Sequence, residues 1–175
     1  MKTYYLAGGC FWCLDAAYRQ LEGVTSVVSG YANGRLKHPT YEAVCTGLTG
    51  DAEAVAVTFD PTVIPEDVIL DIFFTIHNPL TRNRQGNDIG PQYRSGMYYT
   101  TEEELQLFEA AAKRAADTWD GKPVTEIVPL QQWVDAEDYH QDFFAKNPYQ
   151  GYCMAVAQPK VNKVRKQYAS YIKPF

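Results

Sequence analysis

The first hundred residues alternate between short β-branched or aromatic runs and longer stretches whose apolar residues recur at helical spacing. The short runs predict strands, because such side chains favour extended backbone, and most of the runs end at glycine, Asn-Gly or Asp-Pro turn signals. We therefore expect four strands, at residues 3–7, 24–28, 52–59 and 95–99. The longer stretches predict two helices, at residues 11–21 and 65–76.

The order of these elements is strand, helix, strand, strand, helix, strand. This order is typical of the split βαβ arrangement, in which helices cover one face of an antiparallel sheet. We therefore assign the chain to the α+β class, as a two-layer α/β sandwich with a split βαβ (ferredoxin-like) core and helical additions.

The later part of the chain carries further helix signals. Thr101 and Glu104 form a capping box ahead of an alanine-rich stretch, and Asp135 is a candidate helix cap. We expect helices at residues 101–119 and 135–144, a strand at residues 124–128, and a basic amphipathic helix near the C-terminus.

Length and composition predict one ordinary domain. The chain has 175 residues, of which 46% are hydrophobic and 21% charged, enough for one sizeable core. We expect a single catalytic domain over residues 1–175, with residues 146–175 as a more mobile extension. Polar loops are expected around residues 38–41 and over residues 81–94, and the second is long enough to suggest a functional role.

Charge and hydropathy exclude two classes of partner. The formal net charge is −5 and most basic residues are scattered, which argues against a nucleic-acid-binding surface. Residues 1–7 run into glycines before any apolar stretch reaches the length of a signal peptide or a membrane span. We therefore expect a cytoplasmic monomer with no membrane partner.

Four cysteines are too few for a disulfide scaffold in a chain of this size. Cys10 is expected at a helix N-terminus, where backbone N–H groups lower the pKa of a thiol and favour the nucleophilic thiolate. Cys13 completes a Cys-x-x-Cys spacing, which suits a redox pair or half of a metal site. Cys45 is expected to be a small buried hydrophobe, whereas Cys153 lies in a segment that can swing toward another sulfur. The residues alone predict a thiol redox enzyme of unspecified substrate.

A set of ordered motifs makes this prediction more specific. The run Gly9-Cys10-Phe11-Trp12 resembles the signature of type A peptide methionine sulfoxide reductases. Further blocks that resemble this family occur in order at residues 30–31, 39–47, 52–55, 84–95, 136–141 and 151–153. The resemblance implies reduction of methionine S-sulfoxide, free or in peptides, in antioxidant protein repair.

The resemblance also implies roles for residues near the nucleophile. Cys10 would attack the sulfoxide sulfur, and Phe11 and Trp12 would form an apolar wall for the substrate methyl group. Asp88 would help to orient the substrate and the polar loop.

The implied oxygen-binding residues are Tyr41, Glu53 and Tyr93. A sulfoxide oxygen leaves only when protonated, so the site needs an acid that stays neutral near pH 7, and burial raises the pKa of a carboxyl. Glu53 shares strand parity with Val55 and Val57, which would aim it along an apolar face. A strand-end carboxylate that faces water is the alternative.

Attack would leave Cys10 as a sulfenic acid, which condenses with a second thiol. The resolving partner is Cys153 or Cys13, and the resemblance favours Cys153, with Cys13 as substitute or second in an exchange. The resemblance implies no cofactor beyond a thiol reductant, thioredoxin, as partner. Asp15, Asn78 and Gln150 depart from the family pattern.

Two other functions compete with this one. The first is a general disulfide oxidoreductase that uses Cys10 and Cys13, and in which Glu53, Asp88 and Tyr93 are incidental. The second is a zinc-stabilised binding module. The sequence favours no metal site, because Cys-x-x-Cys is not matched by a second closely spaced ligand pair.

Overall fold

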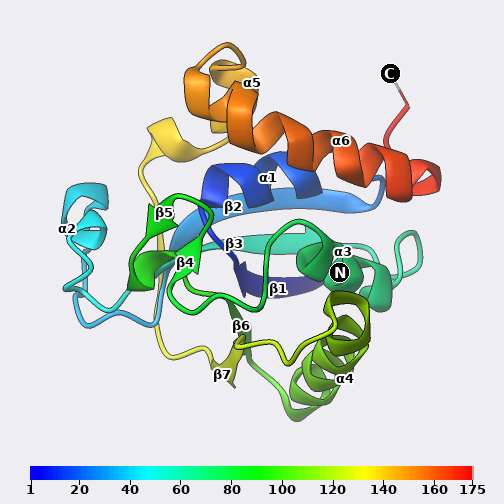
Figure 1. The fold of residues 1–175 in the computed structure, drawn as a ribbon, viewed down its shortest axis with the longest axis horizontal. Helices are drawn as coiled ribbons and strands as arrows, with labels where there is room; N and C mark the ends of the chain where they lie inside the picture. Colours follow the sequence, from blue (N-terminus) through cyan, green and yellow to red (C-terminus); the bar gives the residue numbers. More distant parts are fainter. Residues whose placement is uncertain (175) are drawn as a thin grey trace.

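A six-stranded sheet forms the centre of the computed structural model, which describes residues 1–174 (Figure 1). Its strands follow the order β7-β6-β1-β3-β2-β8, and neighbours are antiparallel except for the parallel pair β6 and β7. The bounds are Lys2–Ala7 for β1, Val24–Ala32 for β2, Ala52–Phe59 for β3, Gly96–Tyr99 for β6, Glu126–Pro129 for β7 and Trp133–Asp135 for β8.

Helices pack on this sheet to give a mixed α/β fold. They are α1 (Phe11–Arg19), α2 (Tyr41–Cys45), α3 (Glu66–Thr75), α4 (Glu102–Trp119), α5 (Phe143–Lys146) and α6 (Gln158–Gln167). Figure 1 shows α1 lying between strand β2 and helix α6, and α1 contacts both. Helices α3 and α4 pack on each other.

Short elements complete the chain. A hairpin of β4 (Arg84–Gln85) and β5 (Asp88–Ile89) precedes the 3-10 turn η1 (Pro91–Tyr93). Further short helices are η2 (Asp138–His140), the π-helical η3 (Cys153–Ala157) and η4 (Ala169–Tyr171). The hairpin and η1 lie inside the segment predicted as a long polar loop.

The two faces of the sheet have different side chains. One face buries large residues against the helices, among them Tyr4, Leu6, Val55, Val57 and Phe59. The other face carries small residues such as Ala52 and Ala54, and it packs with Tyr98 and Trp133. A Cβ on Gly30 would overlap the Trp133 ring, so this glycine lets the indole approach β2 closely.

Most local predictions are confirmed. The strands expected at residues 3–7, 52–59 and 95–99 agree with β1, β3 and β6 to within one residue, and β2 extends further than residue 28. The helices α1, α3 and α4 are also confirmed, and the Thr101 side chain accepts from the Glu104 N–H as a capping box requires.

The helix expected at residues 135–144 is wrong. Asp135 ends β8, and the following residues form η2 and the short α5. The Gln141 side chain bonds both backbone groups of Ser29 on β2, at 2.8 and 2.9 Å, and Asp142 adopts a left-handed φ of 53°. These contacts hold the segment against the sheet edge instead of letting it continue as a helix.

Two other segments differ from expectation or go beyond it. The short helix α2 was not predicted, and the Thr40 side chain caps it by accepting from the Ala43 N–H. Residues 153–167 form a continuous helical segment packed on α1, with Cys153, Ala157 and Val164 buried. The mobility expected for the C-terminal extension stays a prediction.

Across residues 1–174, none of the helices combines the length and the apolar character that a membrane crossing needs.

Candidate active site

Cys10 stands where the chain turns from β1 into α1. Gly9 has a left-handed φ of 84°, and a Cβ there would lie 2.9 Å from Gln85 Cγ. Cys10 itself is the N-cap residue, with extended φ and ψ of −67° and 131°. The predicted position at a helix N-terminus is therefore confirmed, and the thiol is 8% exposed.

The charge state of Cys10 differs from the expectation. Burial raises its pKa well above the usual value, and the hydrogen bond with Cys13 and the nearby Glu53 raise it further. The helix N-terminus acts in the predicted direction, through the Trp12 N–H, but burial outweighs it. The same thiol–thiol hydrogen bond lowers the pKa of Cys13. Cys13 is thus the more acidic member of the pair.

Glu53 is a buried acid that faces this thiol pair. It is 1% exposed on β3, so the alternative of a strand-end carboxylate in water does not apply. Its Oε1 accepts from the Phe11 N–H at 3.2 Å, and its Oε2 has no partner in the described residues. Burial raises the pKa of Glu53 to about 8, so the side chain is mainly protonated at neutral pH.

Tyr41 and Tyr93 complete the polar side of the site. Tyr41 is the first residue of α2 and Tyr93 the last of η1. Burial raises the pKa of both hydroxyls, and the charge of Glu53 adds to the effect on each. Both tyrosines therefore remain neutral hydrogen-bond donors close to Glu53, and Cys10 acts on Tyr93 in the same way.

Trp12 belongs to an aromatic cluster beside the thiols. Its ring stacks on Phe143 with centroids 3.7 Å apart and planes 4° apart. Its Nε1–H donates to His140 Nδ1 at 2.9 Å. Phe11 is fully buried and packs its ring 5.0 Å from His140 and 5.7 Å from Tyr31. Trp12 is partly exposed, so the indole is the aromatic surface open to a substrate.

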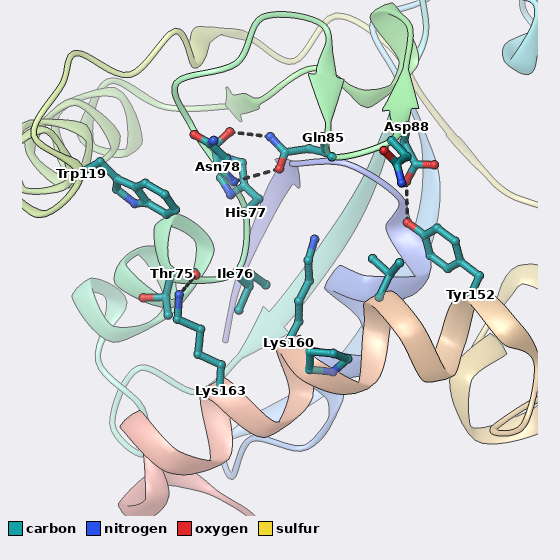
Figure 2. Close-up of a pocket in the computed structure, with 14 residues that line it drawn as sticks. Thr75, Ile76, His77, Asn78, Gln85, Asp88, Trp119, Tyr152, Lys160 and Lys163 are labelled. Carbon is teal, nitrogen blue, oxygen red and sulfur yellow. Dashed lines mark hydrogen bonds between the residues drawn. The ribbon is translucent and has the colours of Figure 1, made fainter.

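Asp88 is tied to the C-terminal segment. The Tyr152 hydroxyl donates to Asp88 Oδ2 at 2.6 Å, and Figure 2 shows the two side chains meeting at one end of a cavity. The Cys13 thiol lies 3.8 Å from the same hydroxyl, as its donor. Sequence reasoning did not assign Tyr152 a role, although it lies inside the block at residues 151–153.

The four cysteines are free thiols. Cys153 is buried in η3, and Cys13 is near enough to raise its pKa further after burial has done so. Cys45 is exposed, which corrects the expectation of a buried hydrophobe. It is the last residue of α2, where burial raises its pKa and the nearby Tyr41 lowers it.

Sequence reasoning also missed Glu137, which anchors the tyrosine side of the site. Its Oε1 accepts from the Tyr31 hydroxyl at 2.7 Å, and its Oε2 accepts from the Tyr41 N–H at 2.9 Å. Burial alone would raise its pKa, but these hydrogen bonds lower it, so Glu137 is a carboxylate. The only available signal was its place, with His140, in the block at residues 136–141.

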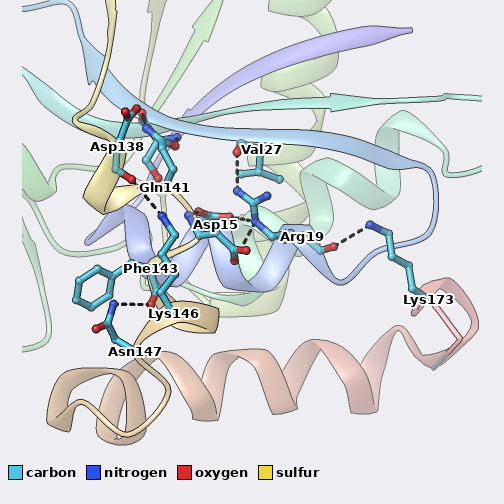
Figure 3. Close-up of polar contacts among 11 residues, drawn as sticks. Asp15, Arg19, Val27, Asp138, Gln141, Phe143, Lys146, Asn147 and Lys173 are labelled. Carbon is cyan, nitrogen blue, oxygen red and sulfur yellow. Dashed lines mark hydrogen bonds and ion pairs between the residues drawn. The ribbon is translucent and has the colours of Figure 1, made fainter.

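The Asp15 carboxylate joins α1 to the segment that carries His140. Arg19 Nε donates to Asp15 Oδ1 at 2.7 Å, and the Asp142 N–H donates to Asp15 Oδ2 at 2.9 Å (Figure 3). Asp15 is 1% exposed, so this carboxylate is desolvated and depends on its partners. The contact holds the segment that supplies Phe143 beside Trp12.

No group of three or more His, Cys, Asp or Glu side chains within residues 1–174 is arranged to hold a metal ion. The site does combine two thiols with a buried neutral acid.

Known proteins are similar to this chain in both sequence and fold. A family model described as peptide methionine sulfoxide reductase matches residues 2–172. A peptide methionine sulfoxide reductase MsrA of Clavibacter sepedonicus is 65% identical over 173 residues, which cover 99% of each chain. The crystal structure of Mxr1 from Saccharomyces cerevisiae in reduced form has a TM-score of 0.82 and 37% identity, over 87% of this chain and 88% of that chain.

A further structure of Mxr1 from Saccharomyces cerevisiae, in complex with Trx2, has a TM-score of 0.59 and 27% identity, over 81% of this chain and 84% of that chain. The family model and the Clavibacter sepedonicus relative each match nearly the whole chain, including every residue of the thiol and acid site. This chain therefore belongs to the peptide methionine sulfoxide reductase family.

Proposed function

We propose that this chain is a peptide-methionine (S)-S-oxide reductase whose nucleophile is Cys10. The observation that carries the proposal is the pairing of a thiol at the start of α1 with Glu53, a neutral buried acid that has one unpartnered oxygen. A sulfoxide needs both groups, one to attack sulfur and one to protonate the departing oxygen.

The reaction transfers one oxygen atom and two electrons. The Cys10 sulfur attacks the sulfoxide sulfur while Glu53 protonates the oxygen, and the proton that the Cys10 thiol loses returns Glu53 to its acid form. The sulfoxide is reduced to the thioether of methionine, and Cys10 is oxidised to a sulfenic acid that carries the oxygen.

Substrate contacts follow from the two sides of the site. Tyr41 and Tyr93 donate hydrogen bonds to the sulfoxide oxygen without adding charge, because burial keeps both hydroxyls protonated. Trp12 receives the substrate methyl group, and Phe11 supports that apolar wall from the core. Asp88 orients the polar part of the substrate from β5.

The three buried or nearly buried thiols form a relay. The Cys13 N–H donates to the Cys10 carbonyl at 3.1 Å on the first turn of α1, and the two thiols affect each other's pKa. The sulfenic acid therefore condenses with Cys13 first, releasing water and forming a disulfide. Cys153, near Cys13, then exchanges into that disulfide. This order departs from the preference for Cys153 that the resemblance gave.

Thioredoxin is the reductant that closes the cycle. The structural relative Mxr1 has been captured in complex with Trx2, which supports the same class of partner here. A thioredoxin dithiol reduces the disulfide by thiol exchange, so the reaction needs no cofactor in this chain.

We also propose the finer assignments of fold and location. The order β6-β1-β3-β2 supports a split βαβ (ferredoxin-like) core within a single domain. Four free thiols suit a reducing compartment, which supports a cytoplasmic location. The reaction needs only one copy of the site, which is consistent with a monomer.

The test is turnover with thioredoxin on matched peptides that carry either the S or the R epimer of methionine sulfoxide. We expect reduction of the S epimer only, complete loss in Cys10→Ser, and single-turnover methionine formation in Cys13→Ser. If the Cys13→Ser protein releases no methionine while the wild type reduces general disulfides, the chain is a Cys-x-x-Cys disulfide oxidoreductase instead.

The order of the relay is tested by mass mapping after one turnover. We expect a Cys10–Cys13 disulfide in Cys153→Ser, and a sulfenic acid that persists longer in Cys13→Ser than in the wild type. A Cys10–Cys153 disulfide formed at the wild-type rate in Cys13→Ser would refute this order.

A further inference from the structure

A cavity of about 550 Å³ begins at the edge of the reaction site and leads away from it. Asp88 and Tyr152 line the end nearest the thiols, while Lys160, Lys163 and Trp119 line the rest (Figure 2). This volume falls in the range of sites that bind small ligands, about 300–1,000 Å³, and so accommodates a neighbouring residue of a substrate.

Charge is divided unevenly along this cavity. Asp88 is the one carboxylate among its described lining residues, and Tyr152 already donates a hydrogen bond to it. Lys160 and Lys163 both come from α6, and Figure 2 shows Lys163 beside Thr75, at the other end of the cavity from Asp88, with Lys160 between the two. The cavity beyond Asp88 therefore carries two ammonium groups and no further carboxylate among its described lining residues.

The two lysines differ in how their ammonium groups are used. Lys163 Nζ donates to the Thr75 carbonyl at 3.1 Å and lies 5.9 Å from the centre of the Trp119 ring. Lys160 forms no hydrogen bond or ion pair with the described residues, and Figure 2 shows its side chain extending from α6 into the cavity. The charge of Lys160 helps to lower the pKa of Cys13. A partly enclosed ammonium that forms no hydrogen bond or ion pair is suited to receive an anion.

Apolar side chains form part of the cavity wall. Ile76, Val156 and Pro159 line the cavity together with Lys160. Apolar walls exclude water and strengthen an ion pair relative to one at an open surface. A carboxylate on a short aliphatic stem matches both features, because its stem contacts the walls while its oxygens reach the ammonium.

We propose that this cavity is a substrate subsite in which Lys160 binds a carboxylate near the methionine sulfoxide. The proposal rests on the reductase function and names the substrate class that the enzyme prefers. The carboxylate has two sources, an acidic side chain flanking the sulfoxide in a peptide, or the α-carboxylate of free methionine sulfoxide.

The test compares blocked peptides that carry Glu or Gln at each of two positions before and after methionine S-sulfoxide. A second arm compares free methionine S-sulfoxide with its amide. At one peptide position, or for the free amino acid, we expect kcat/KM of the substrate with the carboxylate to be about five times that of its amide counterpart. A factor of this size is expected of an ion pair that is partly exposed to water. The peptide and free-substrate arms identify the source.

Variants assign the preference to Lys160. K160Q should reduce the Glu-to-Gln ratio to about one, and K160E should favour a Lys-bearing peptide instead. K166Q, on an exposed position of the same helix, should keep the wild-type ratio. Because each ratio compares two substrates of one variant, a general loss of folding or thiol reactivity cancels.

Three results would overturn the proposal. The wild type could show no carboxylate preference in either arm, or K160Q could lower kcat/KM for Glu and Gln peptides equally. K160Q could also raise KM for thioredoxin alone, which would make the cavity part of the reductant surface. If no peptide is turned over, the reductase function fails, and calorimetric binding of the same peptides to Cys10→Ser still tests the subsite.

Discussion

The Phe11 N–H donates a hydrogen bond to Glu53 Oε1 at 3.2 Å, which ties the first residue of α1 to the buried acid of β3. One contact between residues 42 positions apart thus places the nucleophile and its acid together. It also leaves Oε2 without a partner, so the second carboxyl oxygen is available to a substrate.

Glu53→Gln should lower kcat/KM by about 10²–10³-fold, because the amide cannot transfer a proton to the sulfoxide oxygen. Wild-type activity should fall as the pH rises above the Glu53 pKa of about 8. The decline above pH 8 should be absent in Glu53→Gln. A pH–rate profile of single turnovers checks this, and an unchanged alkaline decline would assign it to another group.

Glu53 should also make stability depend on pH. Its pKa is raised on folding from 4.5 to about 8, so its contribution is fully present below pH 4.5 and is lost as the pH rises through 8. The free energy of unfolding should decrease on the order of a few kcal/mol over this window. Urea denaturation at several pH values measures this free energy. It should change less with pH in Glu53→Gln than in the wild type.

The local elements were predictable because their signals are local. The β-branched residues of β3 and the capping box of α4 act over a few neighbouring residues. Burial of Glu53 and the raised pKa of Cys10 depend instead on which segments cover β3 and α1. Strand parity indicated a face for Glu53, but only the packed structure shows that burial outweighs the helix N-terminus at Cys10.

The indole of Trp12 should depend on His140 for its orientation. Trp12→Phe keeps an aromatic ring beside Phe143 but removes the N–H that His140 accepts. We expect KM for the sulfoxide to rise about tenfold, since an unpaired buried polar atom costs about 1–3 kcal/mol. His140→Phe should have a similar effect. The double variant should raise KM by less than the two single effects combined. If the two effects on KM are strictly additive as free energies, the contact between Trp12 and His140 is unimportant.

Asp15→Ala should destabilise the protein by about 3 kcal/mol, because it leaves Arg19 without its buried partner. The loss also frees the Asp142 N–H and so loosens the segment that supports Trp12. Chemical denaturation gives the free energy of unfolding. Asp142→Asn is the comparison variant, because it removes only the exposed ion pair with Arg19 and keeps the backbone N–H and a residue tolerant of positive φ. It should destabilise the protein much less than Asp15→Ala does. Equal stability of Asp15→Ala and wild type would refute this role.

Long-range contacts also explain the parts of the site that the sequence did not predict. Tyr152 reaches Asp88 across 64 positions, and Gln141 bonds to Ser29 across 112. No local pattern encodes such pairs, so the segment around residues 135–144 was predicted to be a helix. The motif blocks did include Glu137 and His140, but they assigned no contact to either residue.

The most direct test of Cys10 as the nucleophile uses the Cys13→Ser/Cys153→Ser double variant in one turnover with S-epimer methionine sulfoxide peptide. This protein lacks both resolving thiols, so oxygen should remain on Cys10 as a trappable sulfenic acid. We predict one methionine and one Cys10 sulfenic acid per protein, and neither product when Cys10→Ser is added. Methionine formed without oxidation of Cys10, or no methionine from the double variant, would contradict the account.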